Sequence, residues 1–91
     1  MYMQQIEVTL INKLGLHARA AAKLVNTASS FSSDISIQKG AQTANGKSIM
    51  AVMMLAASCG TDLVITAKGD DQGSALEALE NLIADRFDEP E

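Results

Sequence analysis

Hydrophobic periodicity switches repeatedly along this chain, and these switches restrict the fold more than any other feature. Apolar and polar residues alternate over four short stretches, as they do in half-buried strands: residues 4–11, 35–38, 42–44 and 62–68. Apolar residues recur at helical spacing over three longer stretches: residues 18–29, 49–58 and 74–87. The predicted order is therefore βαββαβα. Amphipathic helices and a sheet with one polar face favour an α+β fold of two layers, with three helices on one face of the sheet.

Length and composition favour one globular domain spanning residues 1–91. Hydrophobic residues make up 47% of the chain, yet no apolar run approaches the roughly 20 residues that cross a bilayer. The first residues lack a basic segment followed by an apolar one, so we expect no secretion signal and no membrane insertion. A single cysteine, Cys59, favours a reduced, cytoplasmic setting. Residues 88–91 are predicted to form a frayed tail.

Charge is unevenly distributed along the chain. Residues 1–69 carry six Lys or Arg and three Asp or Glu, whereas residues 70–91 carry one Arg and eight Asp or Glu, for a net charge of −4. This acidic balance, with only three aromatic residues, argues against nucleic-acid binding, which needs a basic patch. One histidine and one cysteine cannot supply the ligands of a metal site, and no cofactor is expected. The mildly basic part suits phosphate chemistry and acidic partner proteins.

The only histidine, His17, lies where a predicted loop meets a predicted helix. Gly15 lets the backbone turn freely, and the alanine-rich run after His17 has high helix propensity. This places His17 at or beside the helix N-cap, with Arg19 in the first turn. The first amides of a helix lack helical partners and the helix dipole adds positive charge, so an anion such as phosphate is favoured there. His17 is a candidate nucleophile inside a phosphate site, although its position alone also fits an ordinary capping histidine.

The segment from Asn12 to Ala21, NKLGLHARAA, resembles the active-site motif of the histidine-containing phosphocarrier family (HPr) of the phosphoenolpyruvate-dependent phosphotransferase system. That motif is G-[LI]-H-[AT]-R-P-A, and the chain departs from it only at Ala20, where the family has proline. A second segment, NGKSIM from Asn45 to Met50, resembles the regulatory-serine segment of the family. The two segments are about the family's usual distance apart, and the resemblance extends over essentially the whole chain.

The resemblance implies an open-faced β-sandwich whose four antiparallel strands have the order 1-4-2-3. It also implies a phosphocarrier: His17 would accept a phosphoryl group on Nδ1, the pros position, from enzyme I and pass it to a histidine of an enzyme IIA protein. The side chain of Arg19 and the backbone amides of Ala18, Arg19 and Ala20 would bind the phosphate. Such a protein is a carrier, not an autonomous catalyst, and we expect it to be a monomer.

Ser48 precedes the second predicted helix and is a good N-cap residue. The matching serine of the family is phosphorylated in some bacteria, so the resemblance implies regulation through Ser48 by a serine kinase or phosphorylase. The helix after Ser48 is too short to bury all its apolar residues, so some are expected to form an exposed partner site. The predicted partner contacts are Ala18, Ala22, Lys23, Ile49, Met50 and Met53, with Met54 and Leu55 nearer the core.

Other functions stay open on the residues alone. A regulatory interaction protein acting through Ser48 without phosphohistidine transfer is favoured by Ala20 but opposed by the presence of His17 and Arg19. Within the carrier reading, the 12–17 segment and the acidic tail favour the nitrogen branch of the system over sugar uptake. A small-molecule or RNA-binding domain fits the order of elements, but no glycine-rich nucleotide loop is present. An autonomous enzyme is least favoured, because Arg19 is the only visible partner for His17.

Overall fold

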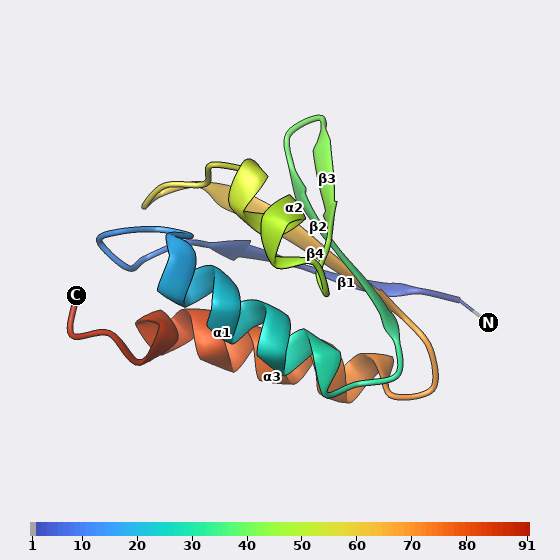
Figure 1. Cartoon of the computed structure of the whole chain (residues 1–91). Helices are drawn as coiled ribbons and strands as arrows, with labels where there is room; N and C mark the ends of the chain where they lie inside the picture. The colour runs from blue at the N-terminus through green and yellow to red at the C-terminus, as the bar shows by residue number, and fades with distance from the viewer. Residues whose placement is uncertain (1) are drawn as a thin grey trace.

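The computed structural model describes residues 2–91, and its helices and strands follow the predicted order (Figure 1). The elements are β1 (Gln4–Thr9), α1 (Ala18–Ser29), β2 (Asp34–Lys39), β3 (Gln42–Asn45), α2 (Ile49–Met54), β4 (Asp62–Lys68), α3 (Gln72–Ala84) and a short 3-10 turn, η1 (Arg86–Asp88). Within residues 2–91, no helix is both long and apolar enough to cross a membrane.

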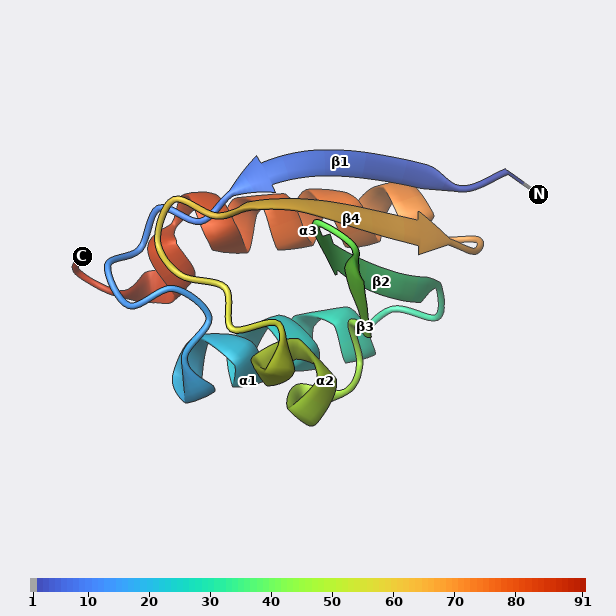
Figure 2. The ribbon, with the colours of Figure 1, turned by 90° about the horizontal axis from the view of Figure 1, so that it is seen from above.

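The four strands form one antiparallel sheet in the order β1-β4-β2-β3, which confirms the order implied by the resemblance. Strand register aligns the apolar side chains into rows across the sheet, one of which consists of Ile6, Ile65, Ile37 and Ala44. Because side chains alternate between the faces of a sheet, such a row lies on one face. The helices cover that face, so the predicted two-layer sandwich is confirmed (Figures 1 and 2).

Small side chains allow α1 to pack closely against α2 and α3. Ala20, Ala21 and Ala28 are fully buried around Leu24, which is also fully buried. Helix α3 runs beside α1 and packs under β1 and β4 (Figure 1). Full burial of one leucine side chain contributes roughly 1.5–3 kcal/mol, so this layer supplies much of the stability of the domain. The rigid packing of α1 also fixes its first turn in space.

The second helix is shorter than the sequence predicts. It ends at Met54 instead of near Ser58, and the left-handed residue that follows it is Ala56, with φ of 50°. The amides of Leu55 and Ala56 form i→i−3 hydrogen bonds, which tighten the final turn. The chain must leave the helix there because the carbonyl of the next residue, Ala57, pairs with the loop that precedes α1.

The last residues are not the frayed tail that their sequence predicts. After α3, three consecutive residues, Arg86–Asp88, have positive φ of 56°, 55° and 62°. Phe87 in the middle of this turn is fully buried, and its carbonyl oxygen accepts a hydrogen bond of 2.6 Å from Lys23 Nζ on α1. The following residues lie against the loop before α1, where the Lys13 amide donates to the Glu91 carbonyl. One buried aromatic side chain thus holds the segment that composition alone marks as solvated.

Asp71 connects the start of α3 to the loop between α1 and β2. Asp71 is the N-cap residue of α3, yet its side chain makes no capping hydrogen bond to its own helix. Its two oxygens accept hydrogen bonds from the backbone amides and hydroxyls of Ser32 and Ser33. The bond from the Ser33 hydroxyl, followed by the other three, lowers the pKa of Asp71 from 3.8 to about 2.

Replacement of this carboxylate, Asp71→Asn, should lower the thermal midpoint Tm at neutral pH. A depressed folded-state pKa stabilises the protein fully above the ordinary value of 3.8, and this stabilisation is lost as the pH falls toward 2. The Tm difference between wild type and variant should therefore shrink over that interval in calorimetry. Asp70→Asn, at the exposed neighbouring carboxylate, is the matched control. An Asp71→Asn deficit that stayed constant with pH would contradict this role.

Candidate functional site

His17 is the N-cap residue of α1. Its backbone is extended, with φ of −74° and ψ of 178°, and the helix begins at Ala18. The backbone amides of Ala18, Arg19 and Ala20 find no acceptor among residues 2–91, whereas the Ala21 amide already bonds the His17 carbonyl. Three unpaired donors and the positive end of a twelve-residue helix therefore lie beside one imidazole ring. This arrangement favours a bound anion.

The loop before His17 is held by a close contact between two backbone segments. Gly15 has φ of 63°, and a Cβ there would lie 2.5 Å from the Ala57 carbonyl oxygen. The neighbouring Leu16 amide donates to the same oxygen at 2.9 Å, and the Leu16 side chain is buried in the core. The predicted turn at Gly15 thus holds the start of α1 against the segment that leads into β4.

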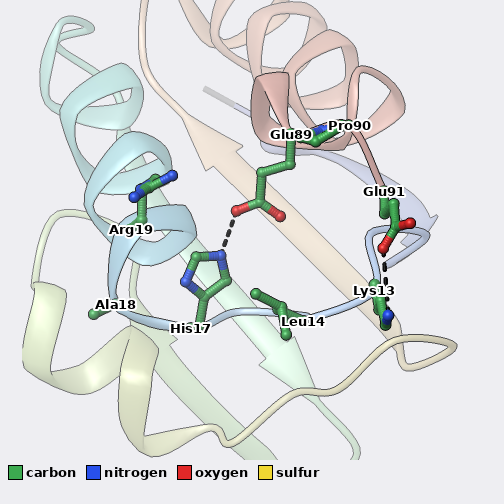
Figure 3. A pocket seen from close by; sticks show the side chains of 8 residues that line it. All are labelled: Lys13, Leu14, His17, Ala18, Arg19, Glu89, Pro90 and Glu91. Atoms are coloured by element: carbon green, nitrogen blue, oxygen red, sulfur yellow. Dashed lines mark hydrogen bonds and ion pairs between the residues drawn. The ribbon is translucent and has the colours of Figure 1, made fainter.

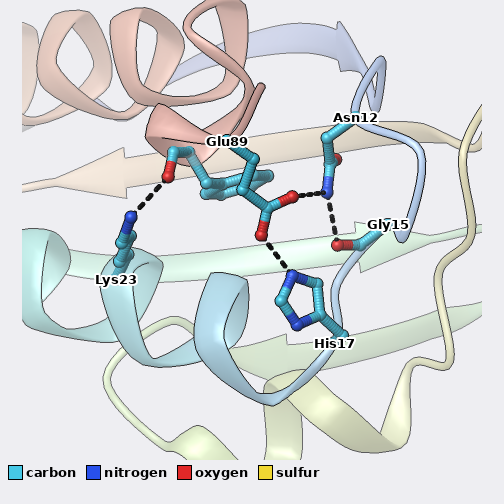
Figure 4. A network of polar contacts seen from close by, with 6 residues as sticks. Asn12, Gly15, His17, Lys23 and Glu89 are labelled. Carbon is cyan, nitrogen blue, oxygen red and sulfur yellow. Dashed lines mark hydrogen bonds and ion pairs between the residues drawn. The ribbon is translucent and has the colours of Figure 1, made fainter. Parts of the chain in front are cut away.

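Glu89 contacts His17 directly, and no local sequence pattern indicates this contact. Nε2 of His17 pairs with Oε2 of Glu89, while Oε1 of Glu89 accepts a hydrogen bond of 3.0 Å from Asn12 Nδ2 (Figure 4). The bond to His17 is the main reason that the pKa of the Glu89 carboxyl is lowered, against partial desolvation that raises it. The Glu89 side chain is only 9% exposed and that of His17 is 28% exposed. The opposite charges of the 1–69 and 70–91 parts were the one available signal.

An open hollow surrounds this pair. It is lined by residues from the loop before α1, the first turn of α1 and the last residues: Lys13, Leu14, His17, Ala18, Arg19, Glu89, Pro90 and Glu91 (Figure 3). Nδ1 of His17 points away from Glu89, on the side of Ala18. Arg19 extends over the same hollow and forms no hydrogen bond or ion pair with residues 2–91. A cation and an unengaged ring nitrogen therefore face one solvent-accessible space.

The second predicted site residue, Ser48, is the N-cap of α2. Its Oγ accepts a hydrogen bond of 3.3 Å from the Ala51 amide, and the side chain is half-buried. The prediction that Ser48 is the N-cap of the second helix is thus confirmed. Ser48 does not line the hollow around His17.

The predicted partner residues are exposed to different degrees. Ile49, Met50 and Met53 are all exposed, as is Ala18, while Ala22 and Lys23 are half-buried. The expectation that Met54 lies nearer the core is wrong, because it is 74% exposed, although Leu55 is buried. Leu14, 65% exposed and beside His17, is an apolar surface residue that sequence reasoning missed. Met50 and Met54 are four residues apart, so they share the solvent face of α2.

Comparison with known proteins identifies close relatives of the whole chain. Residues 4–85 match a family described as "PTS HPr component phosphorylation site". The "Phosphocarrier protein HPr" of Pseudomonas aeruginosa is 50% identical over 98% of this chain and 100% of its own length. Among solved structures, HPr-C-His from Thermoanaerobacter tengcongensis has a TM-score of 0.93 at 43% identity, covering 97% of this chain and 99% of the other. An HPr dimer from the same organism has a TM-score of 0.77 at 44% identity, covering 94% and 99%.

Gly15→Ala should destabilise the domain and disturb His17 together. A left-handed alanine costs about 1–2 kcal/mol, and the clash with Ala57 adds a further cost, for a total of about 2–4 kcal/mol in urea unfolding. Gly40→Ala is the matched control, because Gly40 has a similar φ of 57° and no atom within 4 Å of an added Cβ. Equal losses of stability for the two variants would show that the contact with Ala57 is unimportant.

Proposed function

The chain belongs to the HPr family of phosphocarrier proteins of the phosphotransferase system, and we propose that it accepts a phosphoryl group from enzyme I on Nδ1 of His17 and passes it to a histidine of an enzyme IIA protein. One observation carries this assignment: His17 caps a helix whose first three amides are unpaired within residues 2–91, inside an open hollow. Neutral imidazole is a nucleophile, and the surrounding donors suit the phosphate that would be attached to it.

Transfer to His17 forms one bond and breaks one. The lone pair of Nδ1 forms the N–P bond, the bond between phosphorus and the donor breaks, and its electron pair stays with the donor. Phosphoryl transfer needs positioning and charge stabilisation more than covalent help from the protein. The amides of Ala18, Arg19 and Ala20 and the guanidinium of Arg19 are placed to supply charge-assisted hydrogen bonds to the phosphoryl oxygens.

The openness of the site suits a carrier, which must release the group that it accepts. The hollow is solvent-accessible, and Arg19 lies on its surface. Ala20, which replaces the family's proline, is the third residue of α1, and its amide has no acceptor among residues 2–91. The replacement keeps the helix and adds one donor that proline lacks. Ala20 is therefore compatible with transfer.

The exposed apolar residues beside the site supply the docking face in this proposal. Ile49, Met50 and Met53 lie on α2, which packs against α1, and Ala18 is exposed at the start of α1. An exposed apolar cluster next to a transfer site suits transient binding of more than one partner, and methionine adapts well to different surfaces. Lys23 has a prior role, since its ammonium bonds the Phe87 carbonyl. Lys23 can therefore contact a partner through its ammonium only if that group leaves the Phe87 carbonyl.

Ser48 is the proposed regulatory site. Its hydroxyl is half-buried as an N-cap, next to the exposed side chains of Ile49 and Met50. A phosphate at the N-terminus of a helix is electrostatically tolerated, but it would place two negative charges beside the docking face. Phosphorylation of Ser48 would thus change partner binding with little change in the fold. We further propose that the protein acts in the cytoplasm and that the monomer is sufficient for transfer.

The test of the carrier function is phosphorylation with phosphoenolpyruvate and a purified enzyme I of either the sugar or the nitrogen branch. Intact mass should show one added phosphate that acid removes, because phosphohistidine is acid-labile and phosphoserine is not. His17→Ala should abolish this label, and Ser48→Ala should retain it. The enzyme I that charges the chain identifies the branch. A label that survived in His17→Ala would disprove the proposal, and no label with either enzyme I would favour a purely regulatory role.

Met50→Glu should weaken binding to enzyme I by on the order of tenfold or more, since a carboxylate would be buried in an apolar contact. Met50 is 68% exposed, so the fold should be unaffected. Met3→Glu is a matched control, because Met3 is also exposed but precedes β1, and the N-terminus of the chain lies at the opposite end of the molecule from the start of α1 (Figure 1). Titration calorimetry measures both affinities, and equal effects would remove α2 from the docking face.

A further inference from the structure

The turn that follows α3 contains three consecutive left-handed residues, which is an unusually strained backbone conformation for a surface turn. Non-glycine residues rarely adopt this conformation because Cβ then crowds the backbone, yet Arg86, Phe87 and Asp88 adopt it consecutively. Such a conformation persists only where its surroundings determine it. Here the fully buried Phe87 side chain and the bond from Lys23 to the Phe87 carbonyl hold the turn against α1. The effect of the turn is to bring Glu89 back over the N-terminus of α1 (Figure 4).

Both carboxylate oxygens of Glu89 have defined partners. Oε1 accepts from Nδ2 of Asn12, and Oε2 contacts Nε2 of His17. Asn12 is fully buried, and its Nδ2 also donates to the Gly15 carbonyl at 2.8 Å, which fixes the orientation of the amide. An ionised carboxylate can only accept hydrogen bonds, so the ring nitrogen that faces it must carry the proton. The neutral imidazole then has its lone pair on Nδ1.

We propose that Glu89 is a positioning residue for His17: delivered by the left-handed turn and oriented by Asn12, it keeps the ring proton on Nε2 and leaves Nδ1 as the nucleophile. The consequence for transfer depends on the function proposed above, but the effect on the tautomer does not. As the Nδ1–P bond forms, positive charge develops on the ring, and the Nε2–H···carboxylate bond stabilises it. When the group departs, the electron pair returns to Nδ1 and the proton stays on Nε2.

Glu89→Gln tests this inference because the geometry predicts a reversed tautomer. The carbonyl oxygen of the glutamine should take the place of Oε1, since Asn12 presents a donor there. A flip of Asn12 would instead turn its own oxygen toward the Gly15 carbonyl, which is unfavourable. The glutamine amide would then donate to Nε2 and shift the proton to Nδ1. Glu89→Ala removes the partner altogether and should give a mixture of tautomers.

The direct measurement is the ¹⁵N NMR spectrum of the His17 ring in the unphosphorylated protein at about pH 8.5, about two units above the ordinary histidine pKa. We expect Nε2–H in wild type, a mixture in Glu89→Ala and a majority of Nδ1–H in Glu89→Gln. If Glu89 only stabilised the fold, its replacement would leave the tautomer unchanged. Thermal unfolding of each variant measures the change in stability separately. Identical tautomers in wild type and both variants would overturn the inference.

Transfer kinetics provide the second readout. The rate of phosphoryl acceptance should fall on the order of tenfold in Glu89→Ala, as expected for loss of one charge-assisted hydrogen bond, and further in Glu89→Gln. Glu80→Gln, the same chemical change at an exposed position of α3, is the matched control and should transfer normally. Wild type that fails to accept phosphate while the tautomers shift as expected would refute the carrier function alone. Normal transfer in wild type and both Glu89 variants would refute the positioning role alone.

Discussion

Burial of the single apolar face of the sheet is the constraint on which the other features of this domain depend. The row of Ile6, Ile65, Ile37 and Ala44 must be covered, and the helices cover it from one side, with α3 against β1 and β4 and α2 against β3. A slip of one residue in any strand would turn its apolar residues to solvent, so the register is strongly specified. The buried alanines of α1 then allow that helix to pack closely against α2 and α3, and this packing determines where its first turn lies.

This packing determines the position of His17 indirectly, through the loop that precedes α1. The loop before α1 connects an edge strand to a helix in the second layer, and it passes the segment between α2 and β4. Contact at Gly15 and the bond from Leu16 to Ala57 join these two connections, which are distant in sequence. The short α2 is part of the same arrangement, since it must end early enough for Ala57 to reach the loop. The exposed side chains of α2 consequently lie on a helix that packs against α1.

The acidic last residues act on the basic part of the chain through specific geometry, not through net charge alone. Phe87 supplies burial, Lys23 supplies one hydrogen bond, and the left-handed turn that contains Phe87 directs Glu89 onto His17. A carboxylate that is largely removed from solvent interacts more strongly with the ring than a fully solvated carboxylate would. The resulting site has hydrogen-bond donors for an anion on one side of the imidazole and a carboxylate on the other. Such asymmetry distinguishes the two ring nitrogens.

The sequence by itself determined the order of elements, the apolar face of each, the N-cap position of His17 and the capping role of Ser48. These features depend on residues close in the chain, where periodicity and helix propensity act directly. The strand order came from the resemblance to HPr. Tertiary structure alone decided the end of α2, the partners of Asp71 and the contact between Glu89 and His17, which are 72 residues apart. No local pattern encodes such a pairing, because it arises only when burial of Phe87 outweighs the strain of three left-handed residues.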